Sequence, residues 1–179
     1  MTSTILFEGE RAEQLDTLAD KPRRLNGSML LWVDLHDPSR AEVEEVAKEF
    51  GLDDESVERL LNPSDGVSFR DRREYIHVTA SAPAQDADAE PRDIECVVGE
   101  NWVVTAHERP AAVLDQFAEL VEGSGRTGDL DGPMFLAGLL EWVLDEHSSA
   151  FERIENELEQ VDSRGCGARA TPRARSSGW

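Results

Sequence analysis

The segment that decides the fold is LWVDLHDP, residues 31–38, an apolar run that ends in three side chains able to bind a metal. Asp34, His36 and Asp37 are either a metal site or the point where a strand gives way to a helix. The preceding run is mostly apolar, which is typical of a buried central strand, and we expect this strand over 29–35. A site built from Asp34 and His36, which share one face of an extended strand, stays the alternative.

A helix start follows this segment directly. Ser39 and Glu42 have the spacing of a capping box, and Pro38 suits a first helical position. Apolar residues then recur at helical spacing as far as Phe50, and Gly51 stands where a helix terminates. Because local capping accounts for the polar residues here, we expect a strand that turns into a capped helix.

Residues 1–128 alternate between strand and helix patterns, which predicts an α/β domain. A helical pattern covers 10–19, and the polar segments 63–74 and 81–92 are predicted loops. The other predicted elements are strands at 5–7, 75–80, 94–98 and 102–106, of which the last two form a hairpin, and helices at 53–61 and 110–122.

Residues 129–163 carry the longest periodic signal. Apolar residues from Leu136 to Val161 recur every three or four positions, a heptad-like seam typical of a long helix. A helix of this length cannot bury all of its surface on a small domain, so we expect it to project or to pair with other helices. Residues 164–179 are a basic low-complexity tail, which we interpret as disordered or as out-of-frame translation.

The chain is strongly acidic, with 38 acidic and 18 basic residues among 179 and a formal net charge of −20. Such a charge repels phosphates and anionic lipid, so we expect cations as partners rather than nucleic acid or a membrane surface. A solubility adaptation explains the charge equally well. No apolar segment approaches the ~20 residues that cross a bilayer, and no signal peptide is evident, so we expect a cytoplasmic protein with no membrane span in this chain.

The residues that could carry chemistry form no known catalytic pattern. Cys96 and Cys166 have neither metal-ligand spacing nor a disulfide framework. The four histidines fit no Ser/His/Asp order and no HExxH motif, and the chain has no phosphate-binding glycine loop. His77 and His147 are expected to be satisfied core or interface residues. We therefore expect that this protein is not an enzyme.

The order of these signals over roughly residues 5–162 resembles the N-terminal cytoplasmic domain of the CorA-like magnesium/cobalt transporter family. The residues that carry the resemblance are LWVDLHDPSRAEVEEVAKEFGLDDESVERLLN (31–62), REYIHVTASA (73–82), IECVVGENWVVTAHE (94–108) and LLEWVLDEHSSAFERIENELEQVD (139–162). The resemblance implies an α/β/α sandwich with a mixed central sheet, followed by a long stalk-type helix. It also implies a homo-oligomer, a pentamer in the family, in the cell membrane with this domain on the cytoplasmic side.

The resemblance further implies the ion-sensing, regulatory domain of a divalent metal ion (Mg²⁺/Co²⁺) transporter. The family's Gly-Met-Asn ion path has no match here, so we expect a chain truncated before the membrane helices and not transport-competent alone. Full-length transporter subunits would then be its partners.

In the family, divalent cations between neighbouring cytoplasmic domains hold the pore closed, through the hard oxygen ligands that suit Mg²⁺. Carried over to this chain, the metal ligands are Glu58 and Glu141. Arg59 stands where the family has an aspartate, and its positive charge would oppose a cation. The alternative is a free-standing acidic protein that binds divalent cations or a partner helix.

Overall fold

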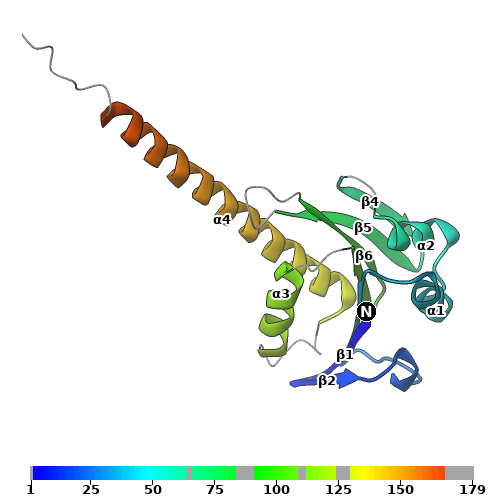
Figure 1. Ribbon diagram of the computed structural model, residues 1–179. Helices are drawn as coiled ribbons and strands as arrows, with labels where there is room; N and C mark the ends of the chain where they lie inside the picture. The colour runs from blue at the N-terminus through cyan, green and yellow to red at the C-terminus, as the bar shows by residue number, and fades with distance from the viewer. Residues whose placement is uncertain (1, 64–65, 84–90, 109–111, 124–129, 168–179) are drawn as a thin grey trace, which may run out of the picture.

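The computed structural model describes residues 2–63, 66–83, 91–108, 112–123 and 130–167 (Figure 1). Within these residues the centre is a seven-stranded mixed sheet of order β2-β1-β3-β7-β6-β5-β4, in which β3 and β7 are parallel and the other neighbours antiparallel. The strands are β1 Thr2–Glu8, β2 Arg11–Leu15, β3 Met29–His36, β4 Ser68–Arg72, β5 Tyr75–Ala82, β6 Arg92–Val98 and β7 Trp102–His107. The predicted strands and the β6–β7 hairpin are confirmed.

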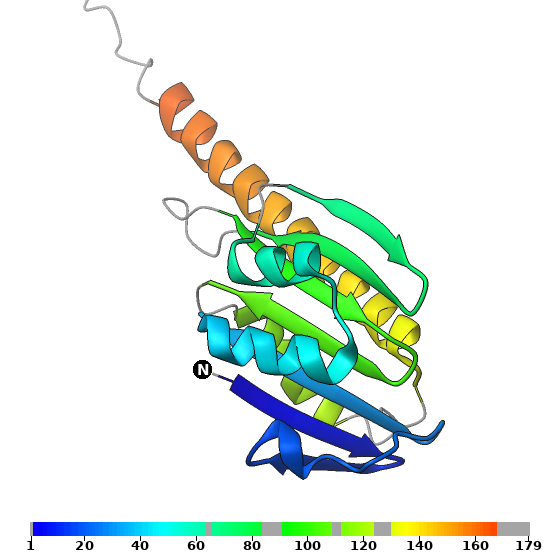
Figure 2. The same ribbon diagram turned by 90° about the vertical axis from the view of Figure 1, so that its right-hand side faces the viewer.

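Helices cover both faces of this sheet. They are α1 Arg40–Phe50, α2 Asp54–Leu61, α3 Ala112–Gly123 and α4 Gly132–Gly167, with a short 3-10 helix, η1, at Leu18–Asp20. α1 and α2 pack on one face, and α3 with the first part of α4 packs on the other (Figure 2). The predicted α/β/α sandwich with a long C-terminal helix is therefore confirmed.

β3 is apolar on both faces because both faces are covered. Leu31 and Val33 lie in the core under α1 and α2, whereas Leu30 and Trp32 lie in the core under α3 and α4. All four side chains are buried. A strand between two helical layers needs apolar residues at every position, which is why the run shows no polar alternation.

α1 begins as the capping box predicts. The Ser39 backbone N–H donates to Oε2 of Glu42 at 2.8 Å, and the Glu42 N–H donates to Oγ of Ser39 at 3.3 Å. Gly51 ends the helix in the left-handed region, at φ 68°. Pro38 was expected in the first helical position but lies before the cap, because Ser39 is the capping residue and the helix starts at Arg40.

Two predictions were wrong, and both concern edge strands. Residues 10–19 form β2 and η1 instead of a helix, and 63–74 contains β4 instead of being a loop throughout. β2 pairs only with β1 and is exposed except at Leu15. Such a strand needs no apolar face, so it has no alternation to recognise.

The arginines of β4 meet the acidic start of α2. Arg72 Nε lies 3.1 Å from Asp53 Oδ2, and Arg70 Nε lies 2.8 Å from Glu55 Oε1. These ion pairs, together with backbone pairing to β5, replace apolar burial at this edge of the sheet. Most of the predicted 81–92 loop, at 84–90, and most of the predicted tail lie outside the described residues.

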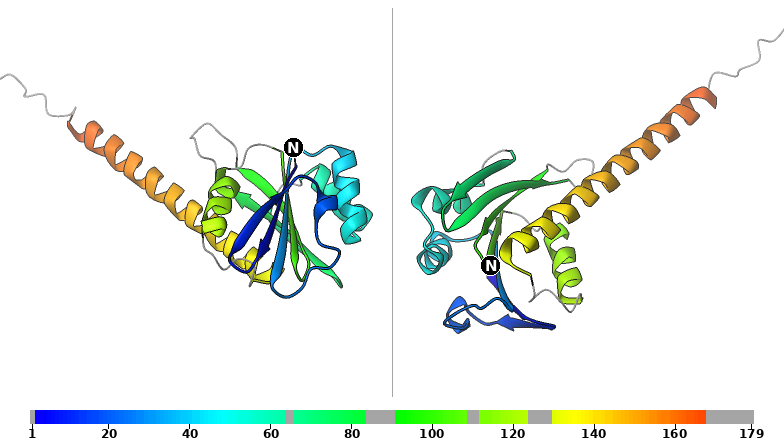
Figure 3. Two further views of the ribbon diagram at one scale, coloured as in Figure 1. Left: turned by 90° about the horizontal axis from the view of Figure 1, so that it is seen from below. Right: turned by 180° about the vertical axis from the view of Figure 1, so that it is seen from behind.

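α4 packs on the sheet only over its first part. Phe135, Leu139 and Val143 are buried, and His147 Nε2 lies 2.7 Å from the carbonyl oxygen of Ser81 at the end of β5. Beyond this point the helix runs away from the sheet (Figure 3). The projecting part of α4 thus begins near the end of β5.

Candidate cation-binding site

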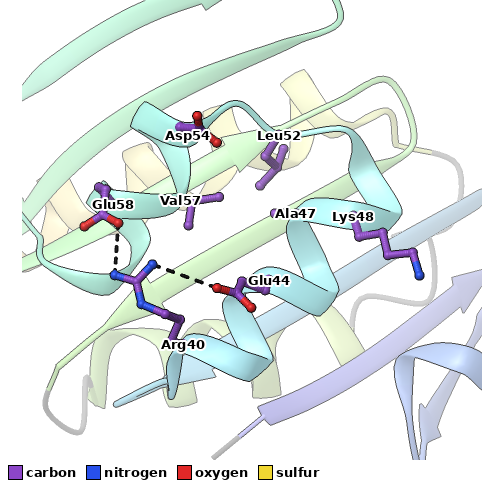
Figure 4. A pocket seen from close by; sticks show the side chains of 8 residues that line it. All are labelled: Arg40, Glu44, Ala47, Lys48, Leu52, Asp54, Val57 and Glu58. Atoms are coloured by element: carbon purple, nitrogen blue, oxygen red, sulfur yellow. Dashed lines mark hydrogen bonds and ion pairs between the residues drawn. The ribbon is translucent and has the colours of Figure 1, made fainter.

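Glu58 lies on the outer face of α2, over a shallow groove between α1 and α2. Its carboxylate is exposed and already has a cationic partner, because Nη2 of Arg40 lies 3.0 Å from Glu58 Oε1. The same guanidinium reaches Glu44 at 3.9 Å, so Arg40 stands between two carboxylates (Figure 4). The groove has a volume of about 320 Å³ and is also bordered by Asp54 and Lys48. Oxygen ligands for a hard cation are present here, but Arg40 competes for them.

Arg59 does not face this groove, contrary to what we expected. Successive helical residues point about 100° apart, and Arg59 turns inward while Glu58 stays in solvent. Its Nη2 donates to Thr79 Oγ1 at 2.7 Å and to Ser68 Oγ at 2.9 Å, and lies 3.4 Å from Glu95 Oε1. The positive charge of Arg59 is therefore paired beneath α2 and does not border a cation at Glu58.

Glu95, the partner of Arg59 in this ion pair, is a fully buried carboxylate. Its Oε2 also lies 2.9 Å from Nε2 of His77 and accepts a hydrogen bond from Thr79 Oγ1 at 2.9 Å. Burial by itself would raise the pKa of Glu95. The hydrogen bonds from His77 and Thr79, with the charges of His77 and Arg59, outweigh it and lower this pKa below its ordinary value.

The same network reaches the start of α2 through His77. Nδ1 of His77 lies 3.1 Å from Ser56 Oγ, and Ser56 Oγ lies 3.0 Å from the Tyr75 hydroxyl. That hydroxyl accepts a hydrogen bond from the Asp53 N–H at 3.1 Å. Since an ionised carboxylate only accepts, His77 donates to Glu95 from Nε2. α2 is thus held on the sheet by a connected set of polar contacts.

Glu141, the other expected ligand, is exposed on α4. α4 lies on the face of the sheet opposite α2 (Figure 2). A single chain therefore does not bring Glu58 and Glu141 to one ion. They lie on two different outer faces of the same domain.

Asp34, His36 and Asp37 at the end of β3 make their contacts with the neighbouring strand β7. Asp34 accepts a hydrogen bond from Thr105 and lies 3.3 Å from Nε2 of His107. The His36 ring stacks on His107, with ring centroids 5.0 Å apart. The backbone N–H of Asp37 donates to the His107 carbonyl. Across the described part of the chain, no group of three or more His, Cys, Asp or Glu residues is arranged to hold a metal.

Sequence reasoning missed the partners of both key residues on α2. Arg40 is separated from Glu58 by 18 positions, and no local pattern connects them. The buried network around Glu95 had a signal in the sequence, because His77, Thr79 and Glu95 are polar residues within mostly apolar stretches of their strands. Buried polar side chains require partners, so such positions predict a network between neighbouring strands.

Comparison with known proteins identifies a family from the sequence and related solved structures from the fold. A family model described as CorA-like Mg²⁺ transporter protein matches residues 27–173. No individual curated protein matches the sequence. No helix in the described ranges is long and apolar enough to cross a membrane.

Solved structures share the fold at low sequence identity. Full-length CmaX is 15% identical with a TM-score of 0.79, and the match covers 98% of this chain and 54% of that one. The soluble domain of CorA from Methanocaldococcus jannaschii is 17% identical, with a TM-score of 0.69 and coverage of 90% and 63%. The cytoplasmic domain of ZntB from Vibrio parahaemolyticus is 12% identical, with a TM-score of 0.66 and coverage of 88% and 63%. This chain thus spans less than two thirds of each.

Proposed function

The chain belongs to the family of CorA-like Mg²⁺ transporter proteins, and from this premise we propose that it is a cytoplasmic, ion-sensing domain that regulates a divalent-cation transporter. Its ligand would be Mg²⁺, or Co²⁺, held between neighbouring copies of the domain. The carboxylates would be Glu58 from one copy and Glu141 from the next.

The observation that carries this proposal is the placement of the two glutamates on opposite faces of the sandwich. Subunits in a closed ring make head-to-tail contacts, in which one face of each subunit meets a different face of its neighbour. Such a contact can bring Glu58 of one copy to Glu141 of another, which a single chain cannot do. A cation between the two would also relieve the repulsion between strongly acidic domains. The ring of five copies implied by the family resemblance is compatible with this arrangement.

The position of Arg59 removes the main objection to a site at Glu58. Its charge is paired with Glu95 inside the fold. The competing group is Arg40, which is exposed and can swing away from Glu58 at small cost, because exposed ion pairs contribute about 0–1 kcal/mol. Cation binding would exchange this contact for a metal–carboxylate contact.

The proposal is tested by titrating the full chain with Mg²⁺ and Co²⁺ in a calorimeter and by sedimentation velocity with and without millimolar Mg²⁺. We expect heat of binding together with a cation-dependent increase in sedimentation coefficient. Glu58→Gln and Glu141→Gln should each abolish both effects. Arg40→Gln should strengthen cation binding, because it leaves the Glu58 carboxylate unpaired.

The matched control is Glu152→Gln, which removes one exposed carboxylate of α4 outside the proposed site. It should leave binding and assembly unchanged. If the control loses as much binding heat and assembly as the two site variants, Mg²⁺ acts only through the overall charge of the protein. No heat with either metal would exclude the proposal.

A further inference from the structure

The turn that leads into β3 contains an asparagine followed directly by a glycine, Asn26 and Gly27, and both residues are exposed. The Asn26 carbonyl accepts a hydrogen bond from the Met29 N–H at 2.9 Å, which closes a β-turn over residues 26–29. A Cβ built on Gly27 would have no atom within 4 Å, so the space beside its backbone is open. The Asn26 side chain and the Gly27 nitrogen are therefore neighbours in a turn that water reaches.

The hydrogen bonds of the Asn26 side chain make its amide carbon more electrophilic. Its Oδ1 accepts from the Ser28 backbone N–H at 2.9 Å and from the Ser28 hydroxyl at 2.7 Å. This is an Asx-turn, in which an asparagine side chain folds back over its own backbone. Hydrogen-bond donors at a carbonyl oxygen stabilise the negative charge that develops there when a nucleophile adds to the carbon. The side-chain amide of Asn26 is thus polarised for attack at Cγ.

We propose that Asn26 is a site of spontaneous deamidation, with the Gly27 backbone nitrogen as the nucleophile. This nitrogen loses its proton and forms a bond to Cγ of Asn26. The bond between Cγ and Nδ2 breaks, and Nδ2 leaves as ammonia with the added proton, so that a five-membered cyclic imide remains. Water then opens the imide at either carbonyl and leaves an aspartyl or an isoaspartyl residue at position 26. Water is the only co-reactant.

The reaction changes the turn that starts the central strand. Either product adds one negative charge to a chain whose net charge is already −20. In the isoaspartyl product the main chain runs through Cγ, so the former carbonyl group of Asn26, which accepts from the Met29 N–H, becomes a free carboxylate outside the main chain. The inference does not require Glu58 to bind a cation, and its failure would leave the proposed cation site untouched.

The other asparagines of the chain serve as internal comparisons, because each lacks one requirement of this reaction. Asn62 precedes Pro63, whose nitrogen carries no proton to lose. Asn101 precedes Trp102, a residue with a large side chain beside the nitrogen that would attack. Asn156 lies within α4, where the helical backbone and its hydrogen bonds fix the next N–H group. The reaction is therefore expected at position 26 before any other asparagine.

The test incubates the full chain at mildly acidic and mildly alkaline pH and follows each asparagine by peptide mapping with mass spectrometry. Asn26 should convert first, and faster at alkaline pH, because the attacking nitrogen must lose its proton. An isoaspartyl O-methyltransferase with a labelled methyl donor should label the peptide that contains position 26. Gly27→Ala should slow the conversion manyfold, since its methyl group crowds the nitrogen yet fits the fold without a clash. Ser28→Ala should slow it severalfold, because one donor to Oδ1 is lost.

The matched control is Ser149→Ala, which removes an exposed serine hydroxyl of α4 far from this turn in the sequence. It should convert at the rate of the unmodified chain, and circular dichroism checks that all variants fold. The inference is wrong if Asn26 remains an amide, or if Asn101 or Asn156 converts as fast. It is also wrong if no isoaspartyl product forms, which would indicate direct hydrolysis, or if the Ser28 variant converts at an unchanged rate.

Discussion

Arg59 and Glu95 show how a charged pair can be retained beneath a helix. Glu95 is completely buried and Arg59 nearly so, and the hydroxyl groups of Ser68 and Thr79 also accept hydrogen bonds from Nη2 of Arg59. A buried pair of this kind contributes little net stability, because desolvation of both ions offsets their attraction. Removing one member alone is costly, since the other is left as an uncompensated charge.

Glu95→Gln should therefore lower the free energy of unfolding by about 3 kcal/mol. Arg59→Met should also destabilise the fold. The double variant should cost clearly less than the sum of the two, because no unpaired charge remains. Urea unfolding of the three variants measures this coupling, and additive losses would contradict it.

Glu42 makes the stability of the fold at the start of α1 depend on pH. Hydrogen bonds from the Ser39 backbone N–H, the Thr2 hydroxyl and the Ser39 hydroxyl lower the pKa of Glu42 from 4.5 to about 2. A carboxyl with a depressed pKa stabilises the fold above its unfolded-state pKa and loses this contribution as pH falls through the folded-state value. The contribution is therefore complete above pH 4.5 and disappears toward pH 2.

We expect Glu42→Gln, which keeps a hydrogen-bonding side chain but no titrating group, to be less stable than the unmodified chain at neutral pH. The difference should shrink as pH falls from 4.5 to about 2. Urea unfolding across this range measures it. Glu45→Gln, at an exposed position of the same helix, is the control and should show no such convergence.

At the scale of elements, close approach of α4 to the β6–β7 hairpin depends on glycine. The N–H of Gly132 donates to the Glu100 carbonyl at 2.7 Å. A Cβ at this position would lie 2.1 Å from the Gly99 carbonyl oxygen, so backbone would have to move. The first turn of α4 can therefore reach the hairpin only without a side chain.

Gly132→Ala should destabilise the protein by about 1–3 kcal/mol through overpacking. Gly138→Ala is the matched variant on the same helix, where a Cβ would meet its nearest neighbour, Phe117, at 3.9 Å. That change should stabilise by about 0.5–1 kcal/mol, because alanine is the better helix former. Denaturant unfolding of both variants measures the difference in the free energy of unfolding. Effects of the same sign would show that the close approach at Gly132 does not exclude a side chain.

The edges of the sheet are built differently from its centre. β4 is held to α2 by ion pairs of Arg70 and Arg72, and β2 is almost wholly exposed. Polar edges of this kind also discourage pairing with other sheets.

At the scale of the whole molecule, charge repulsion is the dominant long-range force. With 38 acidic and 18 basic residues, the chain carries a net charge of −20. Such an excess destabilises the compact state, and salt screens it. Local ion pairs are screened as well, but the 18 basic residues are too few to pair with all 38 acidic residues.

We expect the melting temperature to rise as monovalent salt is increased from low ionic strength to ~0.15 M, where the screening length is about 8 Å. Differential scanning calorimetry in KCl provides the measurement. A melting temperature that is flat or falls with salt would show that repulsion does not limit stability. If Mg²⁺ raises it more than KCl at equal ionic strength, specific cation binding acts in addition to screening.

The sequence by itself determined the elements that are specified by neighbouring residues. The apolar run of β3, the capping box at Ser39, the left-handed Gly51 and the seam of α4 depend on contacts within a few positions or on simple periodicity. Their order also determined the family resemblance. Glu58 and Glu141 came from that resemblance, and the physical patterns alone did not select them.

Only the tertiary structure decided what depends on distant partners. The edge strands β2 and β4 exist because a neighbouring strand supplies their hydrogen bonds, not because their residues favour strands. Arg59 turns away from the solvent because its partner, Glu95, lies beneath α2, and this partner is 36 positions away in the sequence. A side chain's direction follows from the partner that compensates its burial, and that partner is brought near only when the sheet is assembled.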